Sequence, residues 1–277
     1  MILPRDFSIY MTTDIITVNN LTKKFNGFTA VNNISFTVKK KEVFAFLGPN
    51  GAGKTTTIQM LITLLKPTRG EAFIDSFSIN HNPEEIRHVI GYVPQMVSVD
   101  GTLTAYENLM LMAKLYDIPS KERDKRINEV LEFLELEELS KALVRKFSGG
   151  MIRKLEIGQA ILHRPPVLFL DEPTSGLDPV ARRHIWKHLF ELRDTSETTI
   201  FFTTHYMEEA EEECDRIAIM HSGNIAAIGT VPELKQKTKS PHATLEDAFI
   251  FFTGANLQEG GNLRDVKRAR ATERRRH

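Results

Sequence analysis

Cysteine is nearly absent from this chain, since Cys214 is the only one among 277 residues. A single cysteine excludes an internal disulfide and favours a reducing compartment. Long apolar runs are missing too: stretches such as Met60–Ile62 and Val167–Leu170 are far shorter than the ~20 residues of a membrane-spanning helix. We therefore do not expect the chain to cross a bilayer by itself.

The N-terminal segment lacks a basic stretch followed by a continuous apolar one, and it contains Asp6, so it does not resemble a secretion signal. We expect a cytoplasmic protein. Net charge is absent as well, because 36 basic residues balance 36 acidic ones. Residues 264–277 hold seven Lys or Arg and two acidic residues, a difference of +5. We expect this tail to be solvated; contact with anionic lipid or nucleic acid is the alternative.

Strand-like and helix-like segments alternate along the chain, which is typical of an α/β domain with a largely parallel sheet. A helix is predicted over residues 54–66, ended by Pro67. Strands are predicted within residues 15–18, 34–38, 42–48, 70–76, 89–95, 167–172, 198–205, 216–220 and 225–229.

From about Thr102 to His163 the pattern changes to helix after helix. Ser120 is the expected N-cap of one of these helices. That helix carries an apolar stripe with i, i+3, i+4, i+7 spacing at Ile127, Val130, Leu131 and Leu134. We predict an inserted helical subdomain here.

Three later segments also have helical patterns. Asp178 and Pro179 supply the N-cap and first-turn proline of a helix that carries Trp186. The glutamate-rich run 207–215 is interpreted as a solvated helix face without a further role. Near the end of the chain, one helical face is predicted to hold Leu245, Ala248, Phe249 and Phe252.

The segment GPNGAGKT, residues 48–55, matches the phosphate-binding pattern G-x-x-x-x-G-K-[ST] and lies between an apolar strand and a helix. Glycines let consecutive N–H groups point at phosphate oxygens, and the helix N-terminus adds partial positive charge. We expect Lys54 to reach the β- and γ-phosphates, Thr55 to offer its hydroxyl to Mg²⁺ and Thr56 to contact the α-phosphate. The alternative, a glycine-rich turn without a ligand, is disfavoured by motif and context together.

Two acidic residues, Asp171 and Glu172, follow the apolar strand VLFL. Ligands of open α/β sheets bind at the carboxyl ends of strands, so both side chains are expected at the nucleotide site. Asp171 is a candidate for holding Mg²⁺, through water. Glu172 is a candidate general base that polarises the attacking water. A polar exit to solvent is the alternative.

With these motifs in place, the chain resembles the nucleotide-binding subunit of an ABC transporter over roughly residues 15–237. FSGGM, residues 147–151, resembles the signature loop of that family, usually LSGGQ. Gln95 in YVPQ matches the Q-loop glutamine, SGLD at 175–178 resembles the D-loop, and His205 matches the switch histidine. These elements appear in the order found in the family.

The resemblance implies a P-loop NTPase fold of the ABC-ATPase type, with a mostly parallel sheet plus an antiparallel β-subdomain. It places the ATPase domain at 14–237, with the helical subdomain inserted at about 97–163, and a C-terminal extension at 238–277. The segment 240–254 resembles the C-terminal part of drug, polysaccharide and lipid exporter ATPases, which favours export.

The resemblance also implies a set of site residues. The catalytic residues would be Glu172, His205 and Gln95, and Mg²⁺ would contact Thr55, Gln95 and Asp171. In this family an aromatic ring, here Phe25, stacks on adenine. Nucleotide binding would involve Phe25, Gly48, Pro49, Asn50, Gly51, Ala52, Gly53, Lys54, Thr55, Thr56, Ser148, Gly149, Gly150 and Asp178.

Two glycine-rich loops are explained if two chains face head to tail. In ABC ATPases the signature loop of one subunit caps the ATP held by the P-loop of the other, so Ser148 would approach the γ-phosphate across the interface. Phe147 replaces the usual leucine and should keep the loop anchored. Met151 replaces glutamine, and a polar contact is expected to be lost.

The resulting hypothesis is an ATPase subunit that uses ATP and Mg²⁺ and binds an integral-membrane permease at the inner face of the membrane. It would pair with a second copy or with another ABC ATPase, and no nucleic-acid partner is expected. One alternative is a soluble ABC-type ATPase, for example in iron–sulfur assembly. Another is a non-catalytic ATP-dependent switch, which Glu172 and His205 disfavour.

Overall fold

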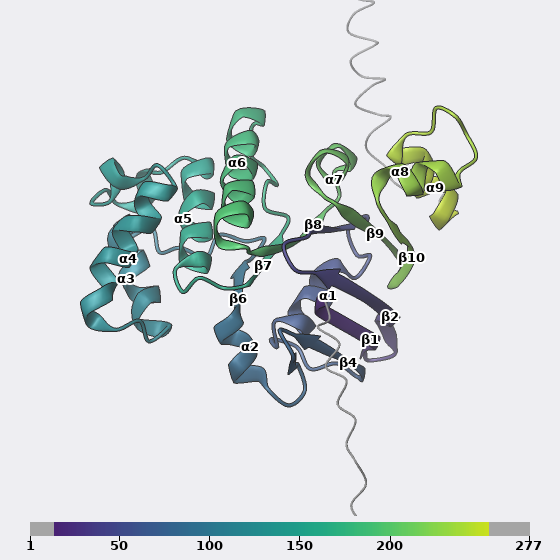
Figure 1. The fold of residues 1–277 in the computed structure, drawn as a ribbon, viewed down its shortest axis with the longest axis horizontal. Helices are drawn as coiled ribbons and strands as arrows, with labels where there is room; N and C mark the ends of the chain where they lie inside the picture. Colours follow the sequence, from purple (N-terminus) through teal and green to yellow (C-terminus); the bar gives the residue numbers. More distant parts are fainter. Residues whose placement is uncertain (1–13, 255–277) are drawn as a thin grey trace, which may run out of the picture.

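The computed structural model describes residues 14–254 and contains two sheets (Figure 1). The six-stranded sheet has the order β10-β9-β3-β8-β7-β6, and β10 is its only antiparallel strand. Its strands are β3 (Val43–Leu47), β6 (Ile90–Val93), β7 (Val167–Asp171), β8 (Thr199–Thr204), β9 (Arg216–His221) and β10 (Asn224–Gly229). The antiparallel sheet has the order β2-β1-β4-β5, with β1 (Asp14–Phe25), β2 (Phe28–Lys39), β4 (Arg69–Ile74) and β5 (Phe77–Ser78). Both the mostly parallel sheet and the antiparallel subdomain are confirmed.

The six-stranded sheet separates two apolar cores, because alternate side chains of its strands point to opposite faces. On β3, Val43 and Ala45 belong to the core shared with the helices between residues 105 and 253. Phe44 and Phe46 belong to the core shared with the helices at 54–61 and 83–89 and with the antiparallel sheet. All five β3 residues are fully buried. The continuous apolar run seen in the sequence is therefore the run of a parallel strand covered on both faces.

A block of helices extends beyond the β6 edge of the sheet (Figure 1). It contains α3 (Ala105–Leu115), α4 (Ser120–Phe133) and α5 (Gly149–Ile161), with two short 3-10 helices at 137–139 and 144–146. The predicted stripe of α4 is confirmed, since all four of its apolar residues are buried in the core. The helical insertion predicted from the sequence thus forms its own side of the molecule.

The remaining helices cover the sheet. They are α1 (Lys54–Leu61), α2 (Pro83–Val89), α6 (Pro179–Ser196), α7 (Met207–Glu213), α8 (Val231–Lys237) and α9 (Leu245–Thr253). Asp178 is the N-cap of α6, as predicted, and Trp186 of that helix is buried. Leu245 and Ala248 of α9 are buried, and Phe249 and Phe252 pack beside them, which confirms the predicted apolar face.

Two helix ends differ from the sequence predictions. The helix that starts at Lys54 ends at Leu61, five residues before the predicted end, and Thr63 has a left-handed φ of 63°. The run from Thr55 to Thr63 is rich in β-branched residues, whose helix propensity is low. Ser120 is the first residue of α4, and its N-cap is Pro119, so the predicted serine cap is wrong.

Within residues 14–254 no helix is long and apolar enough to span a membrane. The predictions about the N-terminal segment and about the basic tail fall outside the described residues.

A pH dependence of stability arises at Glu213, at the end of α7. Burial, reinforced by the charges of Glu212 and Glu209, raises the pKa of Glu213 to about 7. The folded chain therefore keeps a proton that the unfolded chain has lost, so this group makes stability fall as the pH rises from about 4.5 to about 7.

We expect Glu213→Gln to raise the melting temperature at pH 8 and to leave it unchanged at pH 4, because glutamine needs no ionisation. Glu208→Gln serves as the control, because Glu208 is exposed on the same helix and is not among the charges that raise the pKa of Glu213, so the difference between the two pH values should stay nearly intact. Thermal unfolding followed by circular dichroism gives both numbers. Equal melting temperatures of wild type and Glu213→Gln at pH 8 would contradict the assignment.

Candidate nucleotide and phosphate site

The glycine-rich loop between β3 and α1 has a backbone that only glycines allow. Gly53, the N-cap of α1, has a φ of 103°, in the left-handed region. Gly48 lies so close to β9 that a Cβ there would be 2.2 Å from the carbonyl oxygen of Met220. The loop is therefore fixed at the carboxyl end of β3 with its N–H groups at the start of a helix, which is the geometry that binds phosphate.

Lys54 is buried in this loop, with 5% of its surface exposed. Its Nζ donates to the carbonyl oxygens of Gly48 at 2.7 Å and Pro49 at 3.1 Å, and it lies 3.8 Å from Oε1 of Glu172. Burial lowers the pKa of Lys54, and the charges of Glu172 and Asp171 oppose the shift. The ammonium group is therefore held at the mouth of the loop among acceptors it can exchange for phosphate oxygens.

Asp171 is placed beside the first helical turn of α1. Its Oδ1 accepts hydrogen bonds from the hydroxyls of Thr55 at 3.1 Å and Thr203 at 2.6 Å. The structure thus brings together two of the three residues that were predicted to contact Mg²⁺, and it adds Thr203 of β8, which sequence reasoning missed. The third, Gln95, donates to Glu172 instead. A hydroxyl and a carboxylate are oxygen ligands of the kind that Mg²⁺ prefers.

Glu172 is the residue on which the predicted site converges. Its Oε2 accepts from Nε2 of Gln95 at 3.1 Å and lies 3.2 Å from Nδ1 of His205. These two residues follow β6 and β8, and Glu172 follows β7 between them. Parallel strands place their carboxyl ends at one edge of the sheet. The three residues therefore meet there, although Gln95 and His205 are 110 positions apart in the sequence.

Glu172 also has an unusual backbone, with a φ of 50° that few residues other than glycine adopt. The hydroxyl of Thr203 accepts the Glu172 N–H at 3.0 Å while donating to Asp171. Thr203 therefore fixes the turn that sends two successive carboxylates to different neighbours. Strain of this kind is common at functional sites.

The second glycine-rich loop forms the start of α5. Ser148 is the N-cap, and its Oγ accepts from the N–H of Met151 at 3.3 Å. The thioether sulfur of Met151 accepts from the Ser148 N–H at 3.5 Å, so a weak contact remains where we expected a polar contact to be lost. Phe147 is 9% exposed and packs in the core, which agrees with its expected anchoring role.

The two glycines of this loop rest on the segment 175–181 of the same chain. A Cβ on Gly150 would lie 3.0 Å from Cβ of Ala181, and one on Gly149 would lie 3.5 Å from Leu177. Asp178 caps α6 by accepting from the N–H groups of Val180 and Ala181 at 2.9 and 3.0 Å. The hydrogen bonds from Ala181 and Val180 lower the pKa of Asp178.

The structure does not join this second loop to the first. Among residues 14–254, no hydrogen bond or ion pair connects Ser148 with Lys54 or Thr55. Ser148 begins a helix of the helical block, whereas Lys54 begins a helix that packs on β2 and β7 (Figure 1). The two glycine-rich loops therefore lie at the N-termini of two different helices, and each N-terminus is a separate candidate site for a phosphate group.

Phe25 lies at the end of β1, where its ring is 43% exposed. Nζ of Lys23 lies 5.0 Å from the centre of that ring. An exposed ring carrying a cation at one face offers an aromatic surface to a planar base.

Sequence reasoning also missed Arg153 and Glu156 of α5. Arg153 donates to the carbonyl oxygens of Pro94 at 2.8 Å and Gln95 at 3.2 Å, and it forms an ion pair with Glu156 at 3.0 Å. Glu156 accepts from the N–H of Ser98 at 2.6 Å and from its hydroxyl at 3.0 Å. The segment after β6 is thereby fastened to the helix that the second glycine loop opens. The sequence signal that could have predicted this ion pair is the spacing of its opposite charges, at i and i+3 on one helix.

Together, a phosphate-binding loop, an Asp–Glu pair at a strand end and a second glycine loop that opens a helix define a P-loop nucleoside triphosphatase with a signature-type loop. A sequence profile of the ABC transporter family matches residues 31–175. The chain belongs to the ABC transporter family, as one of its ATP-binding, ATP-hydrolysing subunits.

Similar proteins agree with this assignment. The chain is 43% identical to the Linearmycin resistance ATP-binding protein of Bacillus subtilis over 220 residues, which is 79% of this chain and 70% of that one. It is 40% identical over 228 residues to the Daunorubicin/doxorubicin resistance ATP-binding protein of Streptomyces peucetius, covering 82% and 69%. A dimeric ATP-binding cassette in a post-hydrolysis state bound to ADP and Pi matches with a TM-score of 0.69 and 29% identity, covering 78% and 98%.

Proposed function

We propose that this chain hydrolyses ATP in a head-to-tail dimer and thereby drives a separate membrane permease that exports its substrate. The observation that carries the proposal is the meeting of Lys54, Gln95 and His205 on one carboxylate, Glu172, beside the phosphate-binding loop. The two resistance proteins among its relatives support export. The dimeric cassette bound to ADP and Pi supports hydrolysis between two subunits.

The P-loop residues fit a nucleoside triphosphate. Lys54 would give up its carbonyl partners for β- and γ-phosphate oxygens, and the N–H groups of the loop would bind the phosphate chain. Phe25 would stack on the base. Gly48 and Gly53 keep this cradle open, because a side chain at either position would collide with neighbouring backbone.

Thr55 and Asp171 fit Mg²⁺, since their hard oxygens are already adjacent, at 3.1 Å. Bound Mg²⁺ would neutralise the developing phosphate charge. No group of three or more His, Cys, Asp or Glu side chains in the described part of the chain is arranged to hold a metal. The ion would therefore take most of its ligands from phosphate oxygens and water, so its binding should depend on nucleotide.

Glu172 is the proposed general base. Gln95 and His205 lie on its Oε2, so they would orient the carboxylate and, with nucleotide bound, turn toward water and the γ-phosphate. Gln95 is held through its own carbonyl by Arg153 of α5. Movement of the helical block would therefore change the position of Gln95 relative to Glu172.

The signature-type loop would complete the site of the facing subunit. Ser148 and the N–H groups of Gly149 and Gly150 lie at the start of the thirteen-residue helix α5, a place that favours an anion. Only a γ-phosphate would reach them across the interface. ATP should therefore close the dimer and ADP should release it.

A permease would dock on the helical block. Four apolar side chains there are largely exposed: Met96, Val97, Leu111 and Leu115, at 82%, 63%, 48% and 66%. They lie on α3 and on the segment directly after Gln95. An exposed apolar group beside a segment fastened to α5 fits a partner whose movement must be coupled to the nucleotide site.

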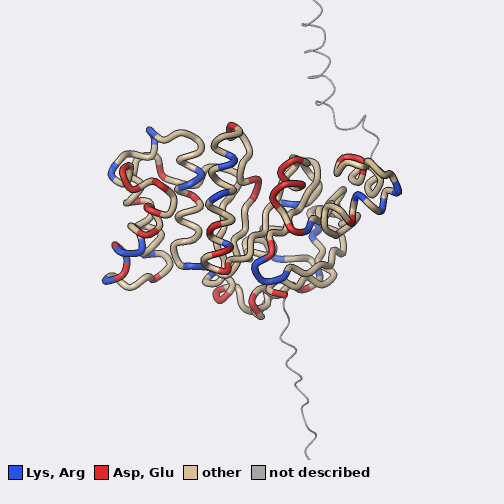
Figure 2. Tube along the Cα trace, turned by 45° about the horizontal axis from the view of Figure 1, so that its top comes forward, with Lys and Arg blue, Asp and Glu red and all other residues tan. Residues whose placement is uncertain are grey.

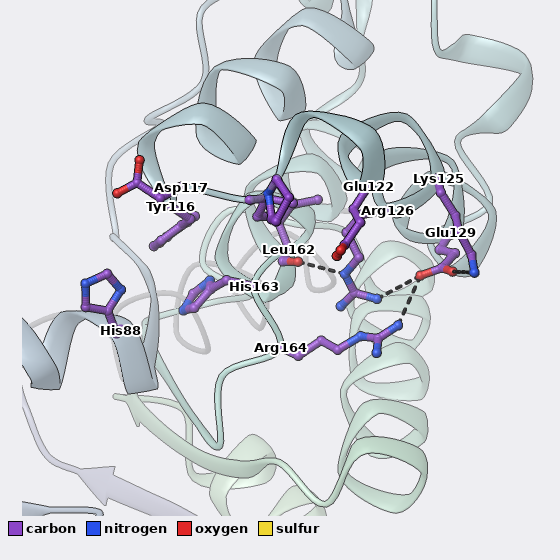
Figure 3. Close-up of a pocket in the computed structure, with 12 residues that line it drawn as sticks. His88, Tyr116, Asp117, Glu122, Lys125, Arg126, Glu129, Leu162, His163 and Arg164 are labelled. Carbon is purple, nitrogen blue, oxygen red and sulfur yellow. Dashed lines mark hydrogen bonds and ion pairs between the residues drawn. The ribbon is translucent and has the colours of Figure 1, made fainter.

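A cavity of about 500 Å³ lies between α2, α4 and the end of α5, and its lining includes Tyr116, directly after Leu115 (Figure 3). None of its lining residues belongs to the P-loop. Arg126 crosses it to the carbonyl oxygen of Leu162 at 2.7 Å and to Glu129 at 3.0 Å. His163 stacks on Tyr116 at 3.8 Å, and burial lowers the pKa of this histidine to about 4, so its ring is neutral. The cavity is therefore suited to a mixed polar and apolar helix of a permease.

We expect Leu115→Glu to prevent recovery of the chain with its polytopic membrane partner while basal ATP hydrolysis stays within about twofold of wild type, since surface changes away from special sites are usually mild. Leu64→Glu is the matched control, because Leu64 is also 66% exposed but lies after α1. Affinity purification from solubilised membranes gives the readout. Recovery of the wild-type chain without any membrane protein would instead favour a soluble role such as iron–sulfur assembly.

A further inference from the structure

The glutamate-rich helix α7 contains one glutamate that does not face solvent. Acidic residues gather along this helix (Figure 2), and Glu208, Glu211 and Glu212 are exposed. Glu209 is only 3% exposed. The interpretation of the run as a purely solvated face is therefore wrong at this position, because one carboxylate per turn points into the protein.

The Glu209 carboxylate is held by three neutral donors from three different elements. Its Oε1 accepts from the hydroxyl of Thr174 at 2.5 Å and from the indole N–H of Trp186 at 3.0 Å. Its Oε2 accepts from the hydroxyl of Thr204 at 2.5 Å. No Lys, Arg or His forms an ion pair with it among residues 14–254. A buried charge of this kind is tolerated only when such hydrogen bonds are complete.

The three donors occupy particular places in the site. Thr174 lies two residues after Glu172 and directly before the segment 175–178. Thr204 directly precedes His205, and its hydroxyl also accepts the N–H of Tyr206 at 3.0 Å. Glu209 therefore ties the chain after β7 to the last residue of β8, close to the points where the candidate base and the candidate switch histidine leave the sheet.

We propose that Glu209 is a positioning residue for ATP hydrolysis, which holds His205 and the Glu172 loop in mutual register. This inference rests on the proposed roles of Glu172 and His205. Glu209 is buried away from the phosphate-binding loop, so it would act through the hydroxyls of Thr204 and Thr174. A displacement of about 1 Å in such a site can reduce turnover as much as 100-fold, whereas ATP binding by the P-loop need not change.

The test compares variants of the full-length chain in steady-state ATP hydrolysis, with thermal unfolding in parallel. Glu209→Ala should lower kcat about 10- to 100-fold and change KM less than about twofold. Glu209→Gln should restore most of the activity, because the amide oxygen can serve Thr174 and Trp186 while the Thr204 hydroxyl turns to accept from the amide N–H. Thr204→Val should reproduce the loss of kcat if Glu209→Ala does not fold.

Two controls separate positioning from general damage. Glu208→Ala, on the exposed face of the same helix, should have wild-type kcat and stability. Trp186→Phe removes one donor to Glu209 without touching either strand end, so it should lower the melting temperature but leave the kcat of the folded protein within about twofold.

A double variant shows whether Glu209 acts through His205. If it does, adding Glu209→Ala to His205→Ala should lower kcat by a clearly smaller factor than Glu209→Ala does in the wild-type chain. Two outcomes would overturn the inference while leaving the proposed function intact. One is a double variant whose loss of kcat equals the product of the two single losses. The other is a kcat of both Glu209→Ala and Thr204→Val equal to that of Glu208→Ala. Full turnover by His205→Ala alone would instead overturn the proposed role of the histidine, and the positioning role with it.

Discussion

Glu172→Gln should lower kcat for ATP hydrolysis about 100- to 1,000-fold, the range expected when a general base is lost, and should leave ATP binding in place. Glutamine has the shape of glutamate, so its amide oxygen can still accept from Gln95, which lies 3.1 Å away. Lys54 keeps its two loop carbonyls at 2.7 and 3.1 Å. The variant removes charge from the site without removing volume.

Because hydrolysis would no longer release the γ-phosphate, this variant should accumulate as an ATP-bound dimer. Light scattering after gel filtration with Mg-ATP, with Mg-ADP and without nucleotide measures the mass directly. We expect a doubled mass with Mg-ATP alone. A monomer under all three conditions, with ATP binding shown by equilibrium dialysis, would count against closure driven by ATP. Wild-type turnover of Glu172→Gln would remove the base from the mechanism.

The parts of the site that could be predicted from sequence are those whose position follows from a strand end. GPNGAGKT, VLFLDE and TTH each place polar residues directly after an apolar run, and parallel strands bring such ends to one edge of a sheet. Gln95 and His205 were identified by their resemblance to motifs of the family, and their positions at the ends of predicted strands agree with the meeting at Glu172. The start of α6 could also be predicted, because Asp178 is a favourable N-cap residue and Pro179 is a favourable first helical residue.

The parts that could not be predicted depend on partners distant in sequence. Five glutamates occur between Glu208 and Glu213, and local pattern alone cannot tell which of them finds buried donors. Glu209 does so because Trp186 and Thr174 come from elsewhere in the chain. Thr203 was overlooked for the same reason: within a buried strand a threonine has the β-propensity of its neighbours, and only the adjacent β7 gives its hydroxyl a function.

Helix ends show a related limit. The apolar residues after Leu61 continue a helical spacing, yet the chain leaves the helix and Leu65 still donates its N–H to the Gln59 carbonyl at 2.9 Å. The competing conformation is stabilised by contacts of the turn, in addition to the low helix propensity of the β-branched residues Ile62 and Thr63. Pro67 therefore marks the last possible end of the helix, and the actual end depends on how the chain reaches β4.

Ser148→Arg should abolish turnover, and mixing this variant with Lys54→Ala should restore part of it. Each variant alone has two damaged sites, since one lacks the signature-type contact and the other lacks the phosphate-binding lysine. In a mixed dimer, both lesions fall in one composite site, and the other site joins an intact Lys54 to an intact Ser148. An equimolar mixture should then recover about a quarter of the wild-type rate, because half of randomly assorted dimers are mixed and each keeps one of two sites.

This complementation depends on the two loops acting across an interface, and a monomeric site cannot produce it. Arginine is suited to the test because Ser148 is exposed at the start of α5, so the large side chain would obstruct the facing subunit without disturbing the core. Ser148→Ala is the conservative control, and it should lose much less activity because the N–H groups of α5 remain. Full activity of Ser148→Arg, or a mixture no more active than its components, would contradict a nucleotide site that two subunits share and that works independently of the second site. Partial recovery would place the phosphate of one subunit against the helix start of the other.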